Sequence, residues 1–193
     1  MMVQAPVEKL SLKSFLALPE AKPASEYIDG EVVQKPMLKL KHSRLQLRLA
    51  LAINESLEPL EVASAFPELR CTFAGRSILP DISVLTWERI TFDAEGTITN
   101  DFEGYPDWAI EILSPGQGYT KVWNKVLHAL NHGTRMGWLV DPDERSILTC
   151  AAGEQPRLFN EAERLAVPAF ADAVELTQGE VFGWLALGRG SAG

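Results

Sequence analysis

The chain has 193 residues, of which 46% are hydrophobic and 23% charged, and its formal net charge is −8. This balance is typical of one globular domain with a full core, and it argues against a disordered chain and against a surface that attracts nucleic acid everywhere. No apolar stretch approaches the ~20 residues that span a bilayer, and the N-terminal segment carries an acid and no long apolar core, so we expect a cytoplasmic protein without a signal peptide or membrane association.

The predicted elements alternate between strands and helices. We expect a short helix over 12–18 capped by Ser11, a hairpin over 25–36 with its turn at Asp29-Gly30, and a long amphipathic helix over 41–58. Then follow strands over 61–66, 69–74 and 78–86, a loop over 91–105, a strand over 107–113, a helix over 119–132, strands over 137–142 and 145–151, and a closing helix over 179–187. No linker or repeat interrupts this order, so we expect a single α/β (α+β) domain over 1–193.

Two acidic residues lie inside apolar strands. Glu111 stands in the middle of DWAIEILSP, and Asp81 follows Pro80 in ILPDISVL. A carboxylate that leaves water without a partner costs several kcal/mol or becomes protonated. Either each acid faces solvent on a half-exposed strand, or the two share a cation, because adjacent strands lie about 4.8 Å apart and carboxylate oxygens suit Mg²⁺ or Mn²⁺. We adopt the second interpretation and predict that Asp81 and Glu111 are metal ligands.

The next helix supplies a lysine for this site. In YTKVWNKVLHALNH the apolar residues form one stripe, which leaves on the opposite side Lys121, Asn124, Lys125 and His128. A lysine beside a metal-bound water can hold it in line, favour its hydroxide form or neutralise charge on a phosphate. We therefore predict a catalytic role for Lys125; the alternative is an ordinary solvated lysine.

Two long windows of the sequence contain no acid. One runs from 32 to 54 and the other from 112 to 140, and together they hold all three histidines and many of the basic residues. If the windows meet in space, they form a positive surface to which a phosphate can bind. The alternative is a chance distribution of charge. We predict phosphate contacts from Lys121, Lys41 and Arg44.

These motifs resemble a large bacterial family of endonucleases built on the PD-(D/E)xK restriction-endonuclease-like fold, formerly catalogued as a domain of unknown function. Its members carry a DGE hairpin, a histidine that opens the first long helix, a PD strand, an E-x-LSP strand, a lysine on the next helix and a WLVDP strand. The corresponding segments are Asp29-Gly30-Glu31, His42, Pro80-Asp81, Glu111 to Pro115, Lys125 and Trp138 to Pro142. The match covers residues 25–150 and implies a mixed β-sheet core flanked by helices, with an N-terminal helix and a C-terminal extension.

The resemblance also implies roles for individual residues. It implies that Asp81 and Glu111 bind the metal, and that Lys125 replaces the lysine that most of the superfamily carries two residues after the acid. It further implies that Glu31 is an additional acid near the metal and that His42 lies beside it. The alternatives are a surface glutamate next to a turn and an ordinary histidine at a helix start.

The segment after LSP departs from the family. Relatives usually carry a Ser-rich loop with Arg and Asp, whereas this chain has GQGYTKVWNK, with Lys121 where an acid is common. Either the site is retuned, or catalysis has been lost while the fold persists. The presence of Asp81, Glu111 and Lys125 favours activity.

Three functions are compatible with the sequence. The first, which we favour, is an endonuclease that hydrolyses phosphodiester bonds in DNA by a metal-activated water, with Mg²⁺ or Mn²⁺ as cofactor. The second is a catalytically inactive module of this fold that binds nucleic acid or protein. The third is a zinc site at His128 and His132, whose i, i+4 spacing suits zinc but which lacks a third ligand. The C-terminal VFGWLAL either forms a homodimer interface or caps the core of a monomer.

Overall fold

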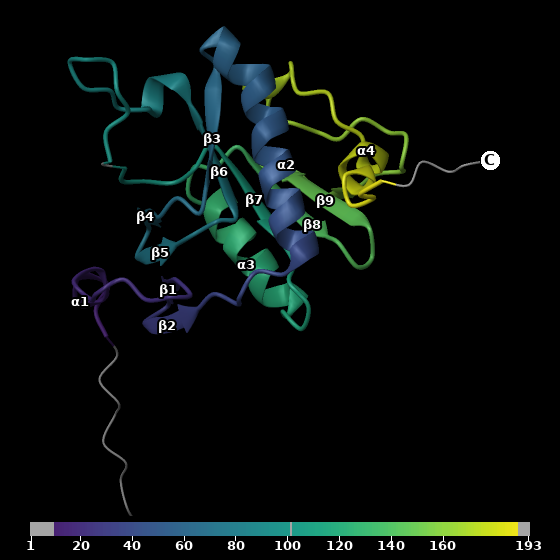
Figure 1. Ribbon diagram of the computed structural model, residues 1–193. Coiled ribbons are helices and arrows are strands. Elements are labelled where there is room, and N and C mark those ends of the chain that lie inside the picture. The colour runs from purple at the N-terminus through teal and green to yellow at the C-terminus, as the bar shows by residue number, and fades with distance from the viewer. Residues whose placement is uncertain (1–9, 101, 189–193) are drawn as a thin grey trace, which may run out of the picture.

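The computed structural model describes residues 10–100 and 102–188 (Figure 1). Residues 1–9, on which the expectation of an absent signal peptide depends, lie outside the described residues. Within the described ranges, no helix is both long and apolar enough to cross a membrane. The helices are α1 (Leu12–Leu16), α2 (Leu40–Leu57), α3 (Tyr119–Leu130) and α4 (Gln178–Gly183). The strands are β1 (Ser25–Ile28), β2 (Glu31–Gln34), β3 (Ala63–Pro67), β4 (Cys71–Phe73), β5 (Arg76–Ile78), β6 (Ile82–Thr86), β7 (Trp108–Ile112), β8 (Met136–Asp141), β9 (Ser146–Ala151) and β10 (Arg157–Leu158).

A six-stranded sheet in the order β10-β9-β8-β7-β6-β3 forms the centre of the fold. Among the strands of the described residues, only β7 and β8 run parallel, and α3 makes the crossover that such a pair requires. α2 and the C-terminal segment cover one face of the sheet, and α3 covers the other (Figure 1). All five residues of β7 are therefore buried. A polar residue in this strand has to find its partners within the protein.

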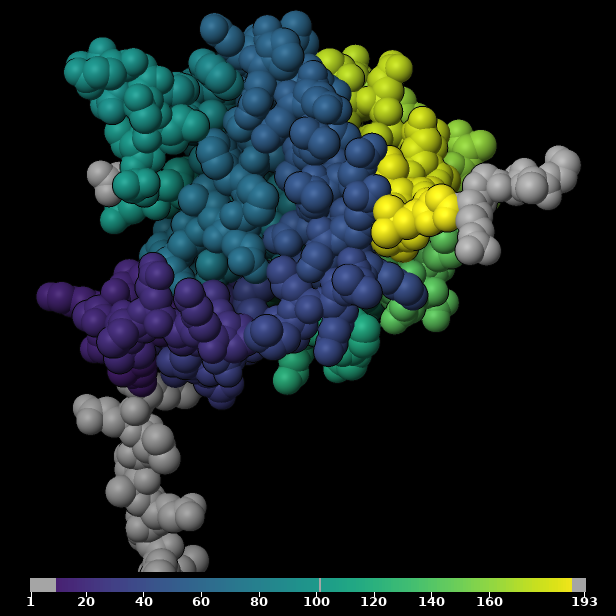
Figure 2. Space-filling model, in the orientation of Figure 1, coloured from purple at the N-terminus to yellow at the C-terminus, as the bar shows by residue number. Residues whose placement is uncertain are grey.

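The long helix α2 supplies one side of the main core. Its fully buried residues recur at helical spacing, as the sequence predicts, and are Leu45, Leu49, Ile53 and Leu57. They belong to the same apolar cluster as Trp108 and Trp138 of the sheet, whose rings meet edge to face. The C-terminal segment lies beside α2 at the surface (Figure 2) and buries Val181 and Phe182 in this core. Part of VFGWLAL therefore caps the core of its own chain.

Four further strands form a separate sheet in the order β2-β1-β5-β4. Its hairpin turns at the predicted residues, with Asp29 (φ 54°) and Gly30 (φ 89°) both in the left-handed region that a type I′ turn needs. The expectation of one strand over 78–86 is wrong, because β5 belongs to this sheet and β6 to the large one. Pro80 lies between them and donates no backbone hydrogen bond, so the pairing breaks there.

Other differences from the expected elements are small. α4 is shorter than the helix expected over 179–187, and β10 was not predicted, since its two residues are exposed and show no apolar pattern. The two sheets and four helices confirm the α+β class and the mixed sheet flanked by helices.

Gly137 in β8 allows α3 to approach the sheet closely. A Cβ at this position would overlap Val126 Cγ1 on α3. We expect Gly137→Ala to lower the free energy of unfolding by about 1–3 kcal/mol, the usual range for overpacking a dense core. Denaturant titration measures this. Gly183→Ala, where an added methyl meets open space, should change stability by no more than about 0.5 kcal/mol. Equal stability of both variants would contradict the close approach.

Candidate active site

Asp81 and Glu111 lie opposite each other on neighbouring strands. β6 and β7 pair antiparallel with Ile82 opposite Ile110, so the same register, continued by one residue, places Asp81 across from Glu111. The backbone N–H of Ile112 donates to Asp81 Oδ2 over 2.7 Å. This bond ties the Asp81 side chain to the strand that carries Glu111.

Asp81 has a partner at each carboxylate oxygen. Lys35 Nζ donates to Oδ1 over 2.8 Å, and His42 Nε2 lies 3.1 Å from Oδ2. Burial raises the pKa of the Asp81 carboxyl, but the hydrogen bond from His42 and the charge of Lys35 outweigh burial and hold this pKa well below its usual range. Asp81 is therefore ionised at neutral pH.

Lys125 joins Glu111 to a third carboxylate, that of Glu26 in β1. Lys125 Nζ lies 2.9 Å from Glu111 Oε1 and 2.8 Å from Glu26 Oε1. Burial, reinforced by the charges of Asp81 and Glu26, raises the pKa of Glu111 to about 8, although Lys125 opposes this rise. Burial lowers the pKa of Lys125, but the surrounding carboxylates outweigh it and raise that pKa above its ordinary value. The two acids of neighbouring strands therefore have pKa values shifted in opposite directions.

Six side chains form one buried group, which we call the acid–lysine cluster: Glu26, Lys35, His42, Asp81, Glu111 and Lys125. Each is only 3–8% exposed. When all three carboxyl groups are ionised, they face two ammonium groups, which leaves one negative charge in excess apart from the imidazole. Residues of these types are rarely buried unless paired, and perturbed pKa values gather at functional sites. The cluster is therefore the candidate active site.

The break between β5 and β6 explains how the cluster is held. Buried backbone groups that no strand pairs need other partners. Glu26 Oε1 accepts the N–H of Leu79 over 2.8 Å, and Lys35 Nζ donates to the carbonyl of Leu79 over 2.9 Å. Gln46 Nε2 donates to the carbonyl of Asp81 over 2.8 Å. The crossing from one sheet to the other thus fixes the side chains that surround Asp81.

The structure brings four of the five predicted catalytic residues into the cluster, namely Asp81, Glu111, Lys125 and His42. It does not bring Glu31 there. Glu31 pairs with Ile28 at the hairpin end and is exposed, and none of the ion pairs among the described residues includes it. The acid that the hairpin contributes is Glu26 instead.

Sequence reasoning missed Glu26 and Lys35. Lys35 lies in the acid-free window over 32–54, which by itself assigns it no role. Glu26 stands in a short hairpin strand whose buried face the sequence does not define. The available signal was weak: Glu26 shares a strand with Tyr27 and Ile28, so an acid lies within a partly apolar run. Its partners Leu79 and Lys125 lie far along the chain.

The two acid-free windows meet at a pocket of about 440 Å³ beside the cluster. Lys39, Lys41 and His42 line it from the first window, and Leu113 and Pro115 line it from the second. Asp143 also lines the pocket, so two lysines and one acid lie beside His42.

The three predicted phosphate contacts differ in their placement. Lys41 is exposed at the pocket and bonds Asp143 over 2.7 Å. Arg44 Nε donates to the carbonyl of Trp184 over 3.1 Å, so its guanidinium lies against the C-terminal segment. Lys121 is exposed in the first turn of α3. Of the three, only Lys41 lines the pocket.

The segment that departs from the family forms an ordered turn. Gln117 Oε1 accepts the N–H of Ser114 over 3.2 Å, and the N–H of Gln117 donates to the carbonyl of Ser114 over 3.0 Å. Gly116 has a φ of 80°, which a residue with a side chain adopts rarely. This turn leads from β7 into α3 and so helps to set the position of Lys125 relative to Glu111.

The donor set of the cluster fits a hard divalent cation. Carboxylate oxygens are the ligands that Mg²⁺ and Mn²⁺ prefer, and Asp81 and Glu111 present theirs from adjacent strands. Residues 10–100 and 102–188 contain no group of three His, Cys, Asp or Glu side chains that could hold a metal ion. Lys35 and Lys125 bind the carboxylates instead. A cation that uses Asp81 Oδ1 or Glu111 Oε1 therefore competes with an ammonium group.

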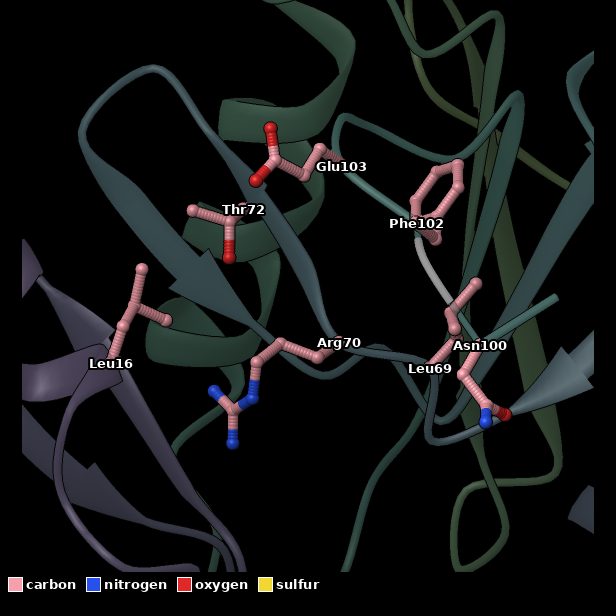
Figure 3. Close-up of a pocket in the computed structure, with 7 residues that line it drawn as sticks. All are labelled: Leu16, Leu69, Arg70, Thr72, Asn100, Phe102 and Glu103. Atoms are coloured by element: carbon pink, nitrogen blue, oxygen red, sulfur yellow. The ribbon is translucent and has the colours of Figure 1, made fainter. Parts of the chain in front are cut away.

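A second pocket, which Figure 3 shows in close-up, has a volume of about 440 Å³. Its lining residues are Leu16, Leu69, Arg70, Thr72, Asn100, Phe102 and Glu103. Arg70 is held by Ser77 Oγ and the carbonyl of Ser25. Since no cluster residue lines this pocket, we do not place the active site there.

The histidine pair lies in an aromatic stack. The His128 ring stacks on Phe73 at 5.0 Å, and His132 Nδ1 lies 2.7 Å from the His128 carbonyl oxygen. Neither histidine belongs to a three-ligand metal group in the part of the chain that the structure describes. Burial of the His128 ring, assisted by the charges of Arg76 and His132, lowers the pKa of His128 to about 4.

This shift predicts a pH dependence of stability. The folded protein binds the His128 proton less tightly than the unfolded chain, whose histidine pKa is about 6.5. The stabilisation is therefore fully present above pH 6.5 and is lost as the pH falls towards 4. We expect His128→Phe, which keeps a ring beside Phe73, to lose less stability than wild type between pH 7 and pH 4.5. Equal losses of stability for wild type and His128→Phe in denaturant titrations would show that His128 does not cause the pH dependence.

The α+β fold, with two acids on adjacent strands and a lysine beside them, defines a protein of the restriction-endonuclease-like class. A family model described as "Uma2: Putative restriction endonuclease" matches residues 12–179. The chain belongs to this family. The crystal structure of a putative nuclease belonging to DUF820 from Anabaena variabilis is similar to it, with a TM-score of 0.88 and 46% identity over 91% of this chain and 99% of that one. No curated protein matches the chain. Family and structural neighbour together support a nuclease function.

Proposed function

We propose that this protein is a metal-dependent endonuclease that hydrolyses phosphodiester bonds in DNA. The observation that carries the proposal is the convergence of Asp81, Glu111 and Lys125 in a buried cluster beside a pocket with basic residues. A polar cluster of this kind is expensive to bury and is not needed to stabilise a core, since apolar residues do so as well or better. A catalytic role explains why the fold contains it.

Several residues of the acid–lysine cluster each have their own role in the proposed hydrolysis. Asp81 and Glu111 would hold Mg²⁺ or Mn²⁺, which when bound lowers the pKa of water and offsets charge on the phosphate. Lys125 is held between Glu26 and Glu111 and presents a fixed positive charge that stabilises negative charge developing on phosphate oxygens. Glu26 positions this ammonium group. His42 orients the Asp81 carboxylate through its 3.1 Å contact.

The approach of the substrate is set by the pocket. Lys39 and Lys41 are exposed there, and contacts of lysine with the DNA backbone provide affinity without sequence information. The net charge of −8 confines attraction for DNA to such local surfaces.

Incubation with supercoiled plasmid tests this proposal. We expect nicked or linear product with Mg²⁺ or Mn²⁺ and none with EDTA. An intact plasmid under all cation conditions, with a correctly folded protein, would contradict nuclease activity on duplex DNA. Single-stranded DNA and RNA of the same sequence, included as further substrates, would show whether the substrate class is different.

A second candidate function is a nucleic-acid-binding module that has lost catalysis. The observation in its favour is that the carboxylates of Asp81 and Glu111 are already paired with Lys35 and Lys125. DNA binding that is unchanged by Asp81→Ala, without any cleavage, would support this alternative.

A further inference from the structure

Asp81 carries a partner that the proposed reaction does not need. Lys35 Nζ lies 2.8 Å from Asp81 Oδ1, an oxygen that a hard cation at Asp81 is expected to use. We infer that Lys35 competes with the divalent cation for Asp81: its ammonium group binds Asp81 Oδ1 and moves to Glu68 when a cation binds. This inference rests on the proposed function, since it concerns the same metal site.

Lys35 has a fixed backbone and a side chain with a choice of partners. It follows β2 and precedes Pro36, and its N–H donates to the carbonyl of Ala24 over 2.9 Å. Its Nζ bonds Leu79 O at 2.9 Å and Asp81 Oδ1 at 2.8 Å, and it lies 3.6 Å from Glu68 Oε1. The flexible stem of a lysine tolerates such a shift while the backbone stays in place.

Glu68 is placed to receive the ammonium group. Its N–H donates to the carbonyl of Asp81 over 3.2 Å, so its backbone is fixed next to the site. Its side chain is 43% exposed, whereas that of Asp81 is 4% exposed. A short outward movement of Lys35 therefore exchanges a buried acid for an exposed one.

Lys125, unlike Lys35, has no exposed acid beside it among the described residues. It bonds Glu26 and Glu111, both of which are buried, and the ion pairs of residues 10–100 and 102–188 give it no exposed acid. The exchange is therefore expected at Lys35. With Glu111 ionised, as a cation ligand must be, departure of Lys35 would leave three carboxylates with one ammonium group. A divalent cation balances this excess of two negative charges.

Calorimetric titration of Mn²⁺ into the full chain tests this inference without relying on activity. We expect Lys35→Met to bind Mn²⁺ at least about tenfold more tightly than wild type, because a full positive charge has left an Asp81 oxygen. Lys35→Arg, which keeps the charge, should bind no more tightly than wild type. Glu68→Gln, which removes the second acceptor, should bind several times more weakly. Lys13→Met removes an exposed lysine of α1, outside the cluster and the pocket beside it, and serves as the control, with unchanged affinity.

The outcomes separate the inference from the proposed function. Equal Mn²⁺ affinity of wild type and Lys35→Met would overturn the inference and leave the nuclease proposal intact. Binding to Lys35→Met but not to wild type would support the inference in its strongest form. The absence of binding to any variant would overturn both. Near-ultraviolet circular dichroism confirms that each variant is folded, and Lys35→Gln, which keeps a donor for Asp81, replaces Lys35→Met if that variant unfolds.

Discussion

Asp81→Asn is expected to reduce cation-dependent DNA cleavage at least about a hundredfold, the loss that follows removal of one group that stabilises charge in a preorganised site. The substitution keeps the shape of the side chain but removes the negative charge that binds Lys35 and that we expect to hold the cation. It should therefore also weaken Mn²⁺ binding. Plasmid cleavage assays measure the cleavage rate, and calorimetric titration of Mn²⁺ into the same preparations measures the affinity.

Asp172→Asn is the matched control for this substitution. Asp172 has a side chain that is 85% exposed and is paired only with Arg164 among the described ion pairs, so its replacement should leave cleavage unchanged. Full activity of Asp81→Asn would exclude Asp81 as a metal ligand. An equal loss in both variants would indicate a general effect of lowered negative charge.

Lys125→Met is expected to have the largest effect on stability. It leaves the carboxylates of Glu26 and Glu111 buried without their shared ammonium group. Removal of one partner of a buried ion pair lowers the free energy of unfolding by about 3–5 kcal/mol. Denaturant titration at neutral pH measures this loss, and cleavage activity should disappear in the same variant.

A second substitution shows whether Lys125→Met lowers stability through the loss of its charge. Glu111→Gln in the Lys125→Met background removes one of the two buried carboxyl groups that have lost Lys125, so it should recover part of the lost stability. It should not recover cleavage, since Glu111 and Lys125 are both needed. No recovery of stability in the double variant would mean that Lys125 stabilises the fold by packing rather than by charge.

The sequence allowed the prediction of Asp81 and Glu111 for a physical reason. Each acid interrupts an apolar strand, where a charge without a partner is unfavourable, so the sequence itself shows that a partner must exist. Lys125 followed from its place on the polar side of the next helix. The structure confirms that these three residues lie together, while their catalytic roles stay predictions.

Glu26 and Lys35 could not be found in this way. Both belong to the β1–β2 hairpin, and their partners are Leu79, Asp81 and Lys125. The pairing depends on how the small sheet docks on the large one, which local periodicity does not encode. The DGE motif drew attention to Glu31, which the structure leaves exposed at the turn.

Pro80 is a second case in which the local sequence does not show how the two sheets are connected. A proline within an apolar strand is typical of a strand start or edge, but it does not show that the chain changes sheets there. The change is what leaves the polar groups of Leu79 to be bound by side chains, and Gln46 adds a side-chain donor at the carbonyl of Asp81, which also accepts the N–H of Glu68. A continuous strand over 78–86 would have satisfied these groups by pairing, without a role for Glu26, Lys35 or Gln46.

A crystal of the protein soaked in Mn²⁺ and measured at the manganese absorption edge provides the most direct test of the metal site. We predict one anomalous peak that lies about 2 Å from carboxylate oxygens of both Asp81 and Glu111. A fully soaked crystal with manganese elsewhere, or with none at this pair, would contradict the assignment of these two acids as joint ligands.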